Sequence, residues 1–74
     1  KSGNLTQALD HYKIALKINP DHKAALEYLG EAYITLGDLK SAQIQLDRLQ
    51  HLCSSTPCEE LNELQQAMIE ATQQ

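Results

Sequence analysis

The sequence predicts an all-α protein: an antiparallel stack of helix–turn–helix units closed by a C-terminal capping helix. Three observations predict this fold class. Apolar residues recur at i, i+3, i+4 and i+7 spacing in four segments, the sequence matches itself at a shift of 34 residues, and Gly, Pro and Asn or Asp separate the segments. No segment shows the sustained alternation of apolar and polar residues that is typical of a strand.

The first two helices are expected over residues 5–18 and 23–36. Asn4 precedes the first apolar run and is expected to cap it. Asn19-Pro20-Asp21 separates the two runs, because proline cannot continue a helix and restricts the residue before it. Gly37 follows the second run, where a left-handed residue would end that helix.

The last two helices are expected over residues 39–53 and 57–72. Asp38 is the predicted N-cap of the third helix. For the fourth, Thr56 is the predicted N-cap, Pro57 the first helical residue, and Glu59 the second half of a capping box. All the connections are short, so neighbouring helices should pack antiparallel.

Charge excludes some classes of partner. The net charge is −4, and residues 1–48 hold six basic and six acidic residues, which cancel. The remaining acidic residues all lie in the last third, which has no Lys or Arg: Glu59, Glu60, Glu63 and Glu70. The chain has no basic stripe for nucleic acid, and an acidic helix would be repelled by anionic lipid. No apolar run reaches the length of a membrane span.

The 34-residue shift aligns small with small and apolar with apolar residues, as repeated packing requires. Gly3 aligns with Gly37, Leu5 with Leu39, Ala8 with Ala42, Tyr12 with Leu46, and Ile18 with Leu52. The polar residues between these aligned positions are free to differ from one segment to the other. Small residues such as Gly30 and Ala42 would let helices approach closely.

These residues resemble the tetratricopeptide repeat, a 34-residue helix–turn–helix unit. The resemblance is carried by Leu26, Leu29, Gly30, Tyr33, Gly37, Leu39, Ala42 and Leu46 in one repeat, and by Gly3, Leu5, Ala8, Tyr12, Ala15 and Pro20 in the second half of the preceding one. It implies a half repeat at 1–22, a full repeat at 23–54 and a capping helix at 55–74. Ala15 and Pro20 become Leu49 and Ser54 where a next repeat would dock, so the array is expected to end there.

The resemblance implies a non-catalytic scaffold that binds a peptide segment or a partner protein. In this family the first helix of each hairpin lines the concave face, which places these residues on the wall: Ala24, Glu27, Glu31, Ile34 and Thr35. Some members clamp a terminal carboxylate there with basic and amide side chains, but Glu27 and Glu31 occupy those positions. An acidic wall favours a basic or neutral segment. The alternative is a purely structural cap of a longer array whose binding surface lies upstream.

Cys53 and Cys58 flank the turn into the last helix and are the only cysteines. By themselves they allow a disulfide, two reduced thiols, or a thiol- or metal-dependent role that includes His51. The last role lacks a fourth ligand, a standard zinc spacing and the C-x-x-C redox motif. The stretch from Glu27-Tyr28-Leu29-Gly30 to Cys58-Glu59-Glu60 also resembles a subgroup of short bacterial members, many of them exported. That resemblance favours the disulfide and a periplasmic over a cytoplasmic location.

No enzyme is expected. His11, His22 and His51 have no Ser, Asp or Cys partner placed in an obvious turn as a catalytic triad would require, and the three glycines form no phosphate-binding loop. The sequence therefore predicts no catalytic residue, no metal and no cofactor, with exposed histidines.

Self-association is the last expectation. The first helix lacks the other half of its repeat, so its apolar stripe should be partly uncovered: Leu5, Leu9, Tyr12 and Leu16. A homo-oligomer or a helix-exchanged dimer would cover it.

Overall fold

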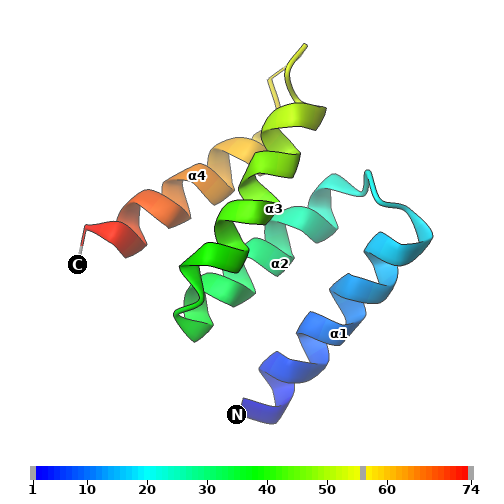
Figure 1. The fold of residues 1–74 in the computed structure, drawn as a ribbon, viewed down its shortest axis with the longest axis vertical. Coiled ribbons are helices and arrows are strands. Elements are labelled where there is room, and N and C mark those ends of the chain that lie inside the picture. The colour runs from blue at the N-terminus through cyan, green and yellow to red at the C-terminus, as the bar shows by residue number, and fades with distance from the viewer. Residues whose placement is uncertain (1, 56, 74) are drawn as a thin grey trace.

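Four amphipathic segments fold into four α-helices in the computed structural model, which describes residues 2–55 and 57–73 (Figure 1). The helices are α1 (Ser2–Ile18), α2 (Lys23–Leu36), α3 (Leu39–Leu52) and α4 (Glu59–Thr72). Successive helices run in alternating directions, and the described residues contain no strand. The predicted fold class, an antiparallel helix–turn–helix stack with a further C-terminal helix, is confirmed.

The turn between α2 and α3 forms as predicted. Gly37 has φ 81°, and its N–H donates to the Ile34 carbonyl at 3.0 Å, which closes α2 in a left-handed conformation. Asp38 then caps α3, because its carboxylate accepts hydrogen bonds from the Ser41 backbone N–H at 3.2 Å and from the Ser41 hydroxyl at 2.8 Å. These two residues allow α3 to fold back along α2.

Two predicted helix starts are wrong. Helix α1 begins at Ser2, so Asn4 lies inside it and is not its N-cap. Gly and Asn disfavour a helix by only about 1 kcal/mol or less each, which is too little to stop one. Helix α4 begins at Glu59, so Pro57 precedes the helix and Glu59 does not complete a capping box. Cys58, which is disulfide-bonded, has an extended backbone that delays the helix; Thr56 lies outside the described residues.

The other helix ends lie close to their expected positions. Helix α2 has the predicted bounds, whereas α3 ends one residue early, with Cys53 as its C-cap. Helix α2 has an N-cap that the sequence did not indicate. The Nδ1 atom of His22 accepts a hydrogen bond from the Ala25 backbone N–H at 3.1 Å, the role that Asp or Ser usually fills.

Helix α2 is central, because it packs against each of the other three helices, with α1 and α4 on opposite flanks (Figure 1). The core is aliphatic and contains one fully buried leucine from each of three helices: Leu26, Leu49 and Leu64. Ala42 is also fully buried, and Gly30 is buried at the contact between α2 and α4. Both small residues are thus inside the stack, as expected. The close approach that Gly30 permits is to Leu64 of α4.

The molecule is flat, with principal extents of 38 × 34 × 17 Å. Both broad faces therefore expose helix surfaces. Among the described residues, no helix combines the length and the apolar character needed to cross a bilayer.

Candidate protein-binding groove

The predicted wall lies on α2, and α4 packs alongside it and divides it into a covered and an open part. Glu27 is only 6% exposed, and Glu63 of α4 lies next to it. Ala24, Glu31 and Ile34 are half-buried, and Thr35 is exposed. The five residues therefore do not form one open surface: the end of the wall near Thr35 is open, whereas Ala24 and Glu27 line a separate pocket at the other end.

That open end forms one side of a groove of about 460 Å³ between α2 and α4. Its lining combines small and apolar side chains with two carboxylates: Glu31, Ile34, Thr35, Gly37, Leu39, Ala67, Glu70 and Ala71. Three of the five predicted wall residues belong to it. The contribution of α4 was not predicted, although Ala67, Glu70 and Ala71 have i, i+3, i+4 spacing and so share one helix face. Such a groove can bury an apolar side chain while its rim attracts a cation.

The covered end of the wall contains a cluster of three carboxylates, from Glu27 and Glu31 of α2 and Glu63 of α4. One oxygen of each lies within 4.8 Å of the others. Burial, side-chain hydrogen bonds with Glu31 and Glu63, and the repulsion of their charges together raise the pKa of Glu27 from 4.5 to about 8. Such a cluster can hold a proton or provide oxygen ligands to a hard divalent cation.

A smaller pocket of about 180 Å³ lies beside this cluster and is strongly acidic. Its lining is Ala24, Glu27, Tyr28, Glu59, Glu60 and Glu63. No Lys, Arg or His belongs to this lining. The start of α4 thus places further carboxylates close to those of α2.

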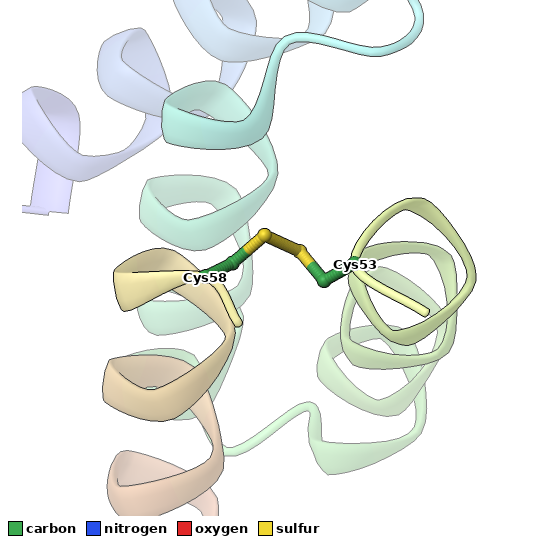
Figure 2. Close-up of a disulfide and its surroundings, with 2 residues drawn as sticks. All are labelled: Cys53 and Cys58. Carbon is green, nitrogen blue, oxygen red and sulfur yellow. A yellow bond between two sulfur atoms is a disulfide. The ribbon is translucent and has the colours of Figure 1, made fainter. Parts of the chain in front are cut away.

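The predicted disulfide is present and joins Cys53 at the end of α3 to Cys58 just before α4 (Figure 2). The two Cα atoms are 5.8 Å apart, and the side chains are 7% and 6% exposed, within the apolar core. The bond therefore anchors the start of α4 to the rest of the stack. In this oxidised form neither sulfur is a thiolate, so the alternative metal role with His51 lacks its thiolate ligands.

The apolar stripe of α1 is covered over two of its four residues and partly uncovered at the other two. Leu9 and Leu16 are buried in the core, and Leu5 and Tyr12 are half-buried against it. Helix α2 supplies the cover, including a ring contact between Tyr12 and Tyr28 with centroids 5.7 Å apart. The apolar residues that α1 does expose are Ile14, at 57%, and Ile18, at 81%. Self-association of the chain itself stays a prediction.

The three histidines are exposed, as expected. His22 has a structural role as the cap of α2. His11 lies beside a shallow depression with Gln7, Asp10 and Ile14, and His51 beside another with Asp47, Arg48 and the Pro20 turn. Among the described residues, neither has a nucleophile and an orienting acid grouped with it as catalysis would require.

A comparison with protein-family models matches residues 1–52 to the model described as tetratricopeptide repeat. The matched part comprises α1, α2 and α3, whereas α4 follows it. Comparisons with curated proteins and with solved structures found no match.

Proposed function

This chain belongs to the tetratricopeptide repeat family, and from that premise we propose that it is a non-catalytic scaffold binding a peptide segment of a partner protein in the groove between α2 and α4. Proteins of this family generally mediate protein–protein interactions, and the repeat fold is typically a non-enzymatic scaffold. The observation that carries the proposal is the groove itself, which is large enough to receive side chains and is lined by small and apolar residues together with two carboxylates.

The charge of the groove supports a basic partner. Glu31 and Glu70 contribute carboxylates from opposite helices, and no Lys, Arg or His belongs to the lining. A Lys or Arg of the partner would be attracted to this rim, while an acidic segment would be repelled. Ile34, Leu39 and Ala67 would contact an apolar side chain next to that basic residue. The proposed ligand is therefore a segment with a basic residue beside an apolar one.

Selection of peptides from a displayed random library on the immobilised chain tests this proposal. Enriched sequences should contain Lys or Arg beside an apolar residue and should perturb the amide NMR signals of Ile34, Thr35, Ala67 and Ala71. Substituting Glu70→Lys should weaken their binding about tenfold, which corresponds to about 1.4 kcal/mol. Glu70 is exposed, so the variant should fold.

The matched control is Asp10→Lys, which makes the same charge change on the exposed surface of α1. It should bind the selected peptides with nearly unchanged affinity at physiological salt, because screening limits the reach of a surface charge. Equal weakening by both variants would mean that net charge alone attracts the peptides. Selection of acidic or purely polar sequences would contradict the proposal.

A second candidate function, capping of a longer repeat array by α4, is favoured by how α4 packs. Leu64 is fully buried against α2, the disulfide anchors the start of the helix, and α4 follows the family match. In that case the binding surface would lie on other repeats. Partner binding by the longest natural protein that contains these residues distinguishes the two functions. If α4 is only a cap, Glu70→Lys in that protein would leave its affinity for the partner unchanged.

The disulfide supports a further proposal, that the protein resides in an oxidising compartment such as the periplasm rather than in the cytoplasm. Thiol alkylation in intact cells tests it. The protein should acquire no alkylating label unless it is first reduced. Labelling of both cysteines without reduction would contradict this location.

A further inference from the structure

We propose that Glu27, Glu31 and Glu63 form a proton-binding site at the contact between α2 and α4, and that α4 packs tightly only while this site holds a proton. The inference concerns the packing of α4 and does not depend on which peptide the groove binds. It starts from the placement of three acidic side chains on two helices that contact each other.

The first step is the chemistry of the cluster. Ionised carboxylates only accept hydrogen bonds, so two of them cannot hydrogen-bond to each other without a proton. One oxygen of each of the three carboxyl groups lies within 4.8 Å of the others, and burial together with the neighbouring Glu31 and Glu63 raises the pKa of Glu27. One shared proton turns repulsion into a hydrogen bond.

The second step is that no other group compensates a negative charge on Glu27. Glu27 is more than nine-tenths buried. In the part of the chain that the structure describes, no ion pair is formed with its carboxylate, and no backbone N–H, hydroxyl or basic side chain donates a hydrogen bond to it. A buried charge without a partner is costly, and the usual outcome is that the group takes up a proton.

The third step is the surroundings. Glu31 of α2 and Glu63 of α4 both face Glu27. Glu59 and Glu60, near the start of α4, belong to the same pocket lining. Helices α1 and α3 contribute no residue to that lining. Every titratable group in the lining is therefore acidic or, for Tyr28, a phenol, so ionisation of Glu27 adds a negative charge to others of the same sign.

The fourth step is position. Gly30, which contacts Leu64, lies one turn beyond Glu27 on α2. Repulsion within the cluster would push apart the surfaces on which Leu64 is buried. The disulfide anchors only the start of α4, so the remainder of the helix is free to respond.

The sign of the pH dependence follows from the raised pKa of Glu27. The folded chain binds this proton more tightly than the unfolded chain, whose pKa is the ordinary 4.5. Stability from this group is therefore fully present below about pH 4.5 and is lost as pH rises to about 8. Above that pH the cluster is ionised and α4 is held more weakly.

Side-chain carboxyl NMR titration of the intact oxidised chain tests the site directly. The Glu27 ¹³C signal should titrate well above the ordinary range of glutamate, and Glu63→Gln should move that midpoint toward lower pH. Asp10→Asn, which deletes one exposed acidic charge on α1, should leave it unchanged. A Glu27 midpoint in the ordinary range of glutamate would overturn the proposal.

Urea unfolding from pH 5.5 to 9.5 tests the consequence. The wild-type midpoint should fall with rising pH. Glu27→Gln imitates the protonated acid and should flatten this fall, and Asp10→Asn should run parallel to the wild type. Parallel curves for wild type and Glu27→Gln would overturn the proposal.

Discussion

Leu64 of α4 occupies the space where Gly30 of α2 has no side chain. A Cβ atom at position 30 would lie 2.7 Å from Leu64 Cδ2 and 3.3 Å from its Cγ. Leu64 is fully buried, so its side chain has little room to move away. The identity of residue 30 thus sets how closely α2 and α4 can pack.

Substituting Gly30→Ala should destabilise the chain by about 1–2 kcal/mol, since overpacking at a closed contact outweighs the gain of up to about 1 kcal/mol in helix propensity. Equilibrium urea unfolding measures the effect. In the background of Leu64→Ala, which itself costs about 2–5 kcal/mol, the same change should be neutral or stabilising. A Gly30→Ala chain more stable than the wild type would show that the contact between position 30 and Leu64 leaves room for a methyl group.

The relation between Gly30 and Leu64 also shows how far the sequence predicts this fold. The periodicity and the 34-residue shift predict the helices, and the resemblance to the tetratricopeptide repeat implies that the small residue Gly30 lies where two helices approach closely. Asp38 and Gly37 were predictable as caps, since their roles depend on backbone conformation within a few residues. The partner of Gly30 was not predictable, because the helix that contacts it begins at Glu59, 29 residues later in the sequence.

The candidate site was less predictable for the same reason. Register places Glu27 and Thr35 on one helix face, but it cannot show that the first is buried and the second exposed. Burial also determines the chemistry, because a solvated Glu27 would keep an ordinary pKa. The cap formed by His22 was missed because histidine seldom fills that position.

The disulfide between Cys53 and Cys58 should stabilise the chain by about 2 kcal/mol, since it closes a short loop in the unfolded state. Unfolding with and without a dithiol reductant measures this contribution. The Cys53→Ala, Cys58→Ala double variant is the control and should not respond to the reductant. If reduction leaves the unfolding midpoint of the natural chain unchanged, packing alone positions the start of α4.

Gly37 is needed for its backbone conformation. Its φ of 81° disfavours residues with a Cβ, yet a Cβ placed there would meet nothing within 4 Å. Substituting Gly37→Ala should therefore cost roughly 1–2 kcal/mol of purely conformational origin. Gly37→Asn should cost less, because asparagine tolerates the left-handed region. Equal losses of stability for Gly37→Ala and Gly37→Asn in urea unfolding would contradict this conformational origin.

Asp38 should stabilise the start of α3 by capping it. Replacing it with alanine removes the acceptor for the Ser41 N–H and hydroxyl and should cost about 1 kcal/mol, measured as a lower urea midpoint. Asp38→Asn is the informative control, because its amide oxygen can still accept the backbone hydrogen bond but carries no charge. It should retain most of the stability. If Asp38→Asn and Asp38→Ala are equally destabilising, the stabilisation comes from the attraction between the Asp38 carboxylate and the N-terminus of α3. That attraction should weaken with added salt.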